Sequence, residues 1–218
     1  MDMKGEAVEI LIVGLGGLGV MSLAASIAEL LRYRYPKVIT NETRAIAQRR
    51  ASVSAAVRAG NNLYASTLHS GTADIVIGLE PMEVLRFENY LQQGTFCLLS
   101  DAIIPINKAS NHHLPSCDTI HNRLSNIGTY NLWLPVSEYL QSLNLEKKYT
   151  SSILLGAFAR SIDIPFECLS KVTNFSSDNR SLLAMELGYK LPEIPKEQHD
   201  LDEVAFQPDL DETIRIPA

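Results

Sequence analysis

Val8-Glu9-Ile10-Leu11-Ile12-Val13 runs directly into Gly14-Leu15-Gly16-Gly17-Leu18-Gly19, and an apolar, alanine-rich stretch over 20–31 follows. The apolar run before the glycines predicts a strand, and the stretch after them predicts a helix. Gly14, Gly16 and Gly19 match G-x-G-x-x-G in the strand–loop–helix context that this pattern requires. Such glycines allow a tight turn and a close backbone approach, and the following helix N-terminus can hold an anion. Residues 8–35 are therefore predicted to open an α/β domain.

The glycine loop (Gly14, Gly16, Gly17 and Gly19) has two interpretations. In one, the loop is a tight turn or a subunit contact. In the other, it binds the phosphate groups of a cofactor, because amide groups at a helix start carry partial positive charge. Glu42 follows Gly19 by 23 residues, which is about where a dinucleotide-binding domain places the acid that binds a ribose.

Strand and helix patterns alternate along the rest of the chain. The expected strands are 37–40, 52–58 (with one solvent-facing side), 74–79, 95–101 and 130–134, and the expected helices are 81–91, 118–126, 136–143, 151–162 (capped by Ser151 or Ser152), 165–172 and 178–187 (ended by Gly188). This order predicts a Rossmann-like α/β fold, with a mostly parallel sheet, helices on both faces and a helical C-terminal third. Residues 1–190 are expected to form the domain, followed by an arm over 191–218.

The composition is that of a globular protein, with 218 residues, 46% of them apolar, and a mean hydropathy of +0.02. No run reaches the roughly 18 apolar residues of a membrane span, and the N-terminus lacks the pattern of a secretory signal. We therefore expect a cytoplasmic protein without a membrane partner. The net charge of −6 lies in residues 193–218, and the rest of the chain is neutral. Such an acidic chain is not expected to bind nucleic acid.

The cysteines are Cys97, Cys117 and Cys168, and they are isolated from one another. No C-x-x-C pair and no cysteine–histidine cluster of zinc spacing occurs, so this chain is expected to hold no metal. Glu80 and Glu83 suggest a pair of catalytic carboxylates, but a place at a helix start explains acids there as well.

Four segments occur in a characteristic order: the glycine loop, residues 42–53 with Gln48-Arg49 at the centre, residues 73–86 with Gly78-Leu79-Glu80-Pro81, and residues 154–159. Over residues 8–175 this order resembles the gamma-type subunit of 2-oxoacid:ferredoxin oxidoreductases, and most of all the small subunit of indolepyruvate ferredoxin oxidoreductase.

The resemblance implies that this chain is one subunit of a larger enzyme complex. Such complexes decarboxylate a 2-oxoacid on thiamine diphosphate, pass electrons through iron–sulfur clusters to ferredoxin, and transfer the acyl group to coenzyme A. A large catalytic subunit is expected to hold the thiamine diphosphate, Mg²⁺ and 4Fe-4S clusters. This chain would bind no cofactor alone, contain no catalytic residue, be inactive by itself and work in a hetero-oligomer.

The segment matched to the partner or coenzyme A contact contains Glu42, Arg44, Gln48, Arg49, Arg50 and Ser52. The chain departs from the family pattern in that Leu18 replaces a glutamine, and Arg44, Ala45, Arg50 and Ala51 replace a histidine and three glycines. The partner surface at this point is therefore expected to differ. Two alternatives stay open: a free-standing NAD(P)-dependent oxidoreductase that uses the glycine loop and Glu42, and a regulatory or binding protein that kept the fold.

Overall fold

The computed structural model describes residues 7–44, 51–105, 115–169, 171 and 178–190. At its centre is a six-stranded sheet in the order β2-β3-β1-β4-β5-β6. The strands are β1 (Val8–Leu15), β2 (Lys37–Arg44), β3 (Ser52–Gly60), β4 (Ile75–Gly78), β5 (Phe96–Ser100) and β6 (Tyr130–Leu134). Parallel pairing joins β1, β4, β5 and β6, whereas β3 runs antiparallel to both neighbours, β1 and β2. The predicted mostly parallel sheet is confirmed, with one reversed strand inside it.

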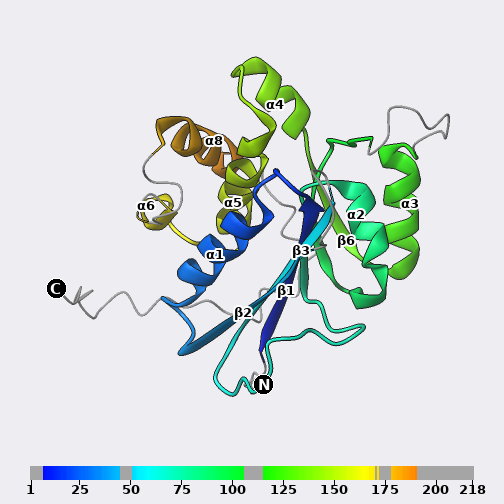
Figure 1. Cartoon of the computed structure of the whole chain (residues 1–218), viewed down its shortest axis with the longest axis vertical. Helices are drawn as coiled ribbons and strands as arrows, with labels where there is room; N and C mark the ends of the chain where they lie inside the picture. Colours follow the sequence, from blue (N-terminus) through cyan, green and yellow to red (C-terminus); the bar gives the residue numbers. More distant parts are fainter. Residues whose placement is uncertain (1–6, 45–50, 106–114, 170, 172–177, 191–218) are drawn as a thin grey trace.

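Helices cover both faces of this sheet (Figure 1). They are α1 (Val20–Leu31), α2 (Pro81–Arg86), α3 (Cys117–Ile127), α4 (Val136–Ser142), α5 (Thr150–Ser161), α6 (Phe166–Leu169) and α8 (Asn179–Tyr189), with short 3-10 turns η1 (Glu88–Tyr90) and η2 (Lys147–Tyr149). One apolar cluster joins α1, α4, α5 and α8 to the first face, and a second joins α2 and α3 to the other face. The helical C-terminal third is confirmed.

Strand β3 differs from its prediction. The alternation over residues 52–58 predicts one solvent-facing side, yet residues 54–57 are all buried. On one face the strand packs against α1. On the other face, Ser54 and Ala56 lie in a pocket that is bordered by Leu68, Phe87 and Tyr90. Polar or small side chains on one face of a strand therefore do not by themselves show that this face is exposed to solvent.

Helix α8 contains Gly188, which was expected to end it. The helix starts after the cap residue Asp178, as predicted, but it continues to Tyr189. A Cβ atom at Gly188 would lie 2.8 Å from the carbonyl carbon of Ile153 in α5. Glycine is thus needed here for a close approach of two helices rather than for a stop. Helix α5 also begins differently, because η2 leads directly into it and Tyr149, not Ser151 or Ser152, precedes it.

Candidate functional site at the carboxyl edge of the sheet

The chain leaves the sheet in opposite directions after β1 and β4. These strands are parallel neighbours, but β1 leads to α1 on one face and β4 leads to α2 on the other (Figure 1). In open α/β sheets, ligands bind beyond the carboxyl ends of the strands at such a point. Here that point lies between the glycine loop and Glu80, so the structure brings these two motifs to one place.

Two of the loop glycines adopt the left-handed conformation, with φ of 97° at Gly17 and 91° at Gly19. Gly19 precedes α1, and a Cβ atom there would collide with the side chain of Ser151 at the start of α5. Gly14 lies within β1, where a Cβ atom would lie 3.0 Å from Leu79 and from Val20. The loop therefore needs glycine for its turn and for close packing, which is the structural part of the prediction. Its binding of a phosphate stays a prediction.

The side chain of Leu18 packs this loop against the core. Its side chain is 5% exposed and belongs to the apolar cluster that joins α1 and α5 to the sheet. Its backbone N–H donates to the carbonyl of Leu15 at 3.1 Å, while Gly16 and Gly17 stay exposed. A leucine in place of the family's glutamine thus exchanges a polar side chain for an apolar contact inside the domain.

Glu80 connects two neighbouring loops of the same edge. Its carboxylate accepts a hydrogen bond from the backbone N–H of Glu83 at 3.0 Å and another from that of Ile104 at 3.1 Å. The first contact caps α2, and Pro81 occupies the first turn of this helix, where proline is favoured. The side chain is 1% exposed, and this burial raises the pKa of Glu80. The Glu-Pro motif therefore joins α2 to the loop after β5.

Glu83 is also buried, in the first turn of α2. Its two carboxylate oxygens make no hydrogen bond within the described residues, although the Arg86 Nε atom lies 3.1 Å from one of them. Arg86 is itself more than half exposed. An acid at this place is favoured by the helix dipole, so its position agrees with the structural interpretation of the Glu80 and Glu83 pair.

The ends of the β2–β3 hairpin lie at the same edge. Arg44 ends β2, and Ser52 pairs with Leu15 beside the glycine loop. The backbone N–H of Gly16 donates to the carbonyl of Ala51 at 2.9 Å, which links hairpin and loop directly. The predicted contact residues Gln48, Arg49 and Arg50 lie outside the described residues. The structure thus places Ser52 beside the loop, whereas β3 separates Arg44 from it, and the roles of all these residues stay predictions.

Glu42 lies farther from the loop than the dinucleotide hypothesis requires. It pairs with Ala55 of β3, and β3 separates its strand β2 from β1. Since neighbouring strands are about 4.8 Å apart, Glu42 is roughly 10 Å to the side of β1. Spacing along the sequence did not reveal that β3 lies between β1 and β2. This position of β3 disfavours a role for Glu42 in binding a ribose at the glycine loop.

Within the described ranges, no three His, Cys, Asp or Glu side chains gather in a way that could hold a metal ion. Cys97 is buried in β5, and this burial raises its pKa to about 12, which disfavours the thiolate that metals bind. In the same part of the chain, no helix combines the length and the apolar character needed to cross a membrane.

Residues 9–191 match the family model described as pyruvate ferredoxin/flavodoxin oxidoreductase. Indolepyruvate oxidoreductase subunit IorB of Archaeoglobus fulgidus is 28% identical over 188 residues, which cover 83% of this chain and 92% of the relative. The subunit of the same name from Thermococcus kodakarensis is 37% identical over 97 residues, which cover 44% of this chain and 48% of the relative.

Solved structures share the fold at low sequence identity. The gamma subunit of a keto/oxoacid ferredoxin oxidoreductase from Geobacter sulfurreducens superposes with a TM-score of 0.60 at 14% identity, over 84% of this chain and 96% of that one. The 2-oxoglutarate:ferredoxin oxidoreductase of Magnetococcus marinus, with 2-oxoglutarate, coenzyme A and succinyl-CoA bound, gives 0.61 at 18% identity, over 85% of this chain and 30% of that one. At such identities the likeness concerns the fold alone.

Proposed function

Because the chain belongs to the pyruvate ferredoxin/flavodoxin oxidoreductase family, we propose that it is the gamma-type subunit of a thiamine-diphosphate-dependent 2-oxoacid:ferredoxin oxidoreductase. The family match over residues 9–191 carries this proposal. The name of the Archaeoglobus relative, nearly all of which aligns with this chain, makes indolepyruvate or another aryl pyruvate the first substrate to test. The complex would release carbon dioxide and pass the acyl group to coenzyme A.

In this proposal the large catalytic subunit holds thiamine diphosphate, Mg²⁺ and the 4Fe-4S clusters. The whole chain has three cysteines, whereas a 4Fe-4S cluster requires four thiolates. Those cysteines also lie apart, in β5 for Cys97, at the start of α3 for Cys117 and in α6 for Cys168. This chain would therefore contribute a surface to the complex rather than a redox centre.

The surface proposed for contact is the carboxyl edge with the glycine loop and the ends of the β2–β3 hairpin. Arg44, Arg49 and Arg50 concentrate guanidinium groups in this segment of the sequence. Such groups bind carboxylates and phosphates through paired hydrogen bonds. A carboxylate of the partner or a phosphate of coenzyme A would therefore suit this place.

The first test is purification of a tagged copy from its native cells. A brown complex is expected, with a large subunit identified by mass, bound thiamine diphosphate and the broad absorbance of iron–sulfur clusters. The complex should reduce ferredoxin when a 2-oxoacid and coenzyme A are supplied. A colourless chain that purifies alone, from cells that contain a thiamine-dependent oxidoreductase with another gamma subunit, would contradict the proposal.

The second test replaces Arg49 and Arg50 together with alanine in the purified complex. The double variant is expected to raise the KM for coenzyme A, or to lower the amount of complex recovered, by tenfold or more. The matched control replaces Arg32 and Arg180, two exposed arginines elsewhere on the molecule. If both double variants behave like the wild type, the arginines of the hairpin have no role in the contact.

A further inference from the structure

Glu83 and Arg86 form an incomplete ion pair on α2. Glu83 is 1% exposed, and its two carboxylate oxygens accept no hydrogen bond from the described residues. The Arg86 Nε atom lies 3.1 Å from one of them, without the direction that a hydrogen bond needs. A buried carboxylate is normally both paired with a cation and hydrogen-bonded. Of these two forms of compensation, Glu83 has the nearby cation alone.

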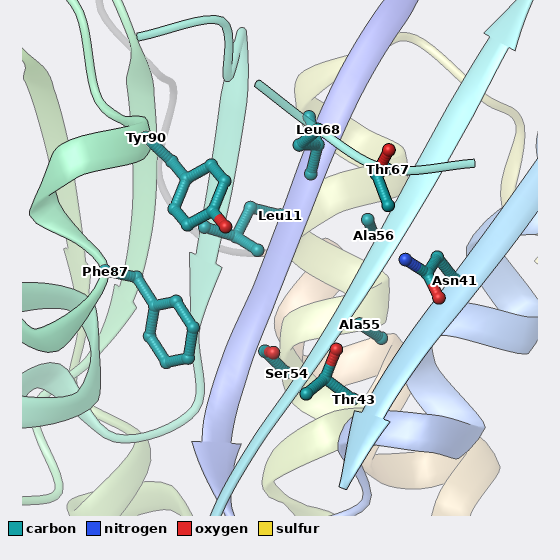
Figure 2. A pocket seen from close by; sticks show the side chains of 10 residues that line it. All are labelled: Leu11, Asn41, Thr43, Ser54, Ala55, Ala56, Thr67, Leu68, Phe87 and Tyr90. Carbon is teal, nitrogen blue, oxygen red and sulfur yellow. The ribbon is translucent and has the colours of Figure 1, made fainter. Parts of the chain in front are cut away.

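The structure of α2 itself does not account for this burial. The carboxylate of Glu80 already caps the helix by accepting the backbone N–H of Glu83. The helix dipole favours an acid in the first turn, but it favours an exposed acid as well. Glu83 lies four residues before Phe87, so the two side chains share one side of the helix. Figure 2 shows the ring of Phe87 in a pocket with Leu11 and Ser54 of the sheet, so this side faces the sheet.

Arg86 presents free hydrogen-bond donors to solvent. Its side chain is 54% exposed, and its two terminal amino groups make no hydrogen bond within the described residues. Arg123 is the useful comparison, because its side chain is similarly exposed at 58%. The Nε and Nη2 atoms of Arg123 both donate to Glu88, at 2.8 Å each. Arg123 thus already holds a carboxylate through paired hydrogen bonds, whereas both terminal amino groups of Arg86 remain available.

The chemistry of the guanidinium group identifies the ligand that suits Arg86. Its N–H donors lie in one plane, and two neighbouring donors bind a carboxylate or a phosphate through paired hydrogen bonds. The negative charge of Glu83 keeps the guanidinium beside α2, so less conformational freedom is lost when a ligand binds. Small molecules usually bind in concave sites, but Arg86 is exposed on a helix and does not line the pocket of Figure 2. A carboxylate on a protein surface therefore suits it better.

We propose that the terminal amino groups of Arg86, oriented by the buried carboxylate of Glu83, bind an aspartate or glutamate side chain of the catalytic subunit. This inference rests on the proposed function, and it adds a contact on α2 to the one proposed at the carboxyl edge. When the subunits meet, water leaves the charged groups, and the electrostatic attraction between them becomes stronger. The burial of Glu83 without hydrogen bonds is then a cost to the isolated chain that the assembled complex offsets.

The test compares two arginine-to-lysine variants. Lysine keeps a positive charge beside Glu83 but lacks the planar pair of donors, whereas Arg86→Ala would leave a buried carboxylate without a cation. Arg86→Lys is therefore the test variant, and Arg123→Lys is its matched control at a residue of similar exposure. Circular dichroism and a thermal melt check that each isolated chain is folded.

Each variant is produced in the native cells together with an equal amount of the wild-type chain. The complex is isolated through a tag on the thiamine-binding catalytic subunit, and mass spectrometry gives the ratio of variant to wild type in it. Arg86→Lys is expected to lower this ratio about tenfold and Arg123→Lys less than about twofold, because only Arg86→Lys removes a hydrogen bond between charged groups of the two subunits. Unchanged ratios for both variants, or equal losses, would overturn the proposal. Absence of the wild-type chain from the complex would instead remove the proposed function.

Glu83→Met separates an orienting role from a structural one. Methionine is similar in size and has no charge, so Arg86 loses its fixed position and the same ratio should fall severalfold. Because the lost carboxylate made no hydrogen bond, the isolated variant should unfold at a urea concentration no lower than the wild type does. A lower unfolding midpoint together with an unchanged ratio would show a purely structural role and overturn the proposal. An unchanged ratio for Arg86→Lys with a raised KM for coenzyme A or the 2-oxoacid would also overturn it, since the ligand would then be a small anion.

Discussion

Replacement of Gly188 by alanine should loosen the contact between α5 and α8. A Cβ atom at Gly188 would lie 2.8 Å from the carbonyl carbon of Ile153, with the carbonyl oxygen closer still. The reverse contact is similar, since a Cβ atom at Gly156 would lie 2.9 Å from backbone atoms of Met185 and Tyr189. Backbone atoms cannot rotate away as a side chain can, so the two helices must separate.

The size of the effect follows from this geometry. Ordinary contact begins at 3.4 Å, and the carbonyl oxygen lies closer to the added Cβ atom than the carbon at 2.8 Å does, so the helices must move apart by well over about 0.6 Å. That shift disturbs the fully buried side chains of Ile153 and Met185. Overpacking costs roughly 1–3 kcal/mol, and the clash with backbone favours the upper end. Alanine gains about 1 kcal/mol over glycine in a helix, so the free energy of unfolding should fall by about 2 kcal/mol.

The assay is urea unfolding followed by far-UV circular dichroism, with the free energy extrapolated to water. The control is Leu183→Ala, which changes a 47% exposed residue of the same helix and introduces no atom into the contact. We expect the midpoint of Gly188→Ala to shift clearly and that of the control to shift little. A Gly188→Ala chain within about 0.5 kcal/mol of the wild type would refute the reasoning.

Two further predictions concern buried titratable groups. Glu80→Gln puts an NH2 group, which cannot accept a hydrogen bond, in place of one of the two oxygens that accept backbone N–H groups, so it should cost about 1–3 kcal/mol in urea unfolding. Because burial raises the pKa of Glu80, its contribution is fully present below pH 4.5 and is lost as the pH rises through the folded value. The free energy of unfolding of the wild type should therefore fall relative to that of Glu80→Gln as the pH rises above 4.5, and a relative rise would contradict this. Cys97, with its pKa raised to about 12 by burial, should resist iodoacetamide at pH 8 until urea unfolds the chain; mass spectrometry of the native protein would reveal a labelled Cys97 if this is wrong.

Local patterns were sufficient for several elements. Helix α1 and strand β6 have the bounds expected from sequence, because continuous apolar patterns and flanking glycines act within a few residues. Long-range contacts explain the differences. The expected helix over residues 81–91 ends at Arg86 and continues as a 3-10 turn from Glu88. Gly188 was expected to stop α8, but its role depends on Ile153, which lies in another helix.

The candidate site divides in the same way. Sequence identified the glycine loop, the Glu-Pro motif and the contact segment, but it could not show that Glu80 reaches the backbone of Ile104. Nor could it indicate the pocket beside Ser54 and Ala56, because its lining residues come from β1, β2, β3, the loop after β3 and the segment with η1 that follows α2.

By itself, the sequence determined the alternation of strands and helices, the glycine loop and the family. These features depend on which residue types occur within a few positions of one another, because backbone conformation and side-chain periodicity are local properties of the chain. Only the tertiary structure decided the order of the strands. The reversed strand β3 lies between β1 and β2, which moves Glu42 away from the loop and brings Ser52 to it. Strand order depends on which distant segments pair and bury their apolar faces together. The periodicity of a single segment is compatible with several strand orders, so it cannot choose among them.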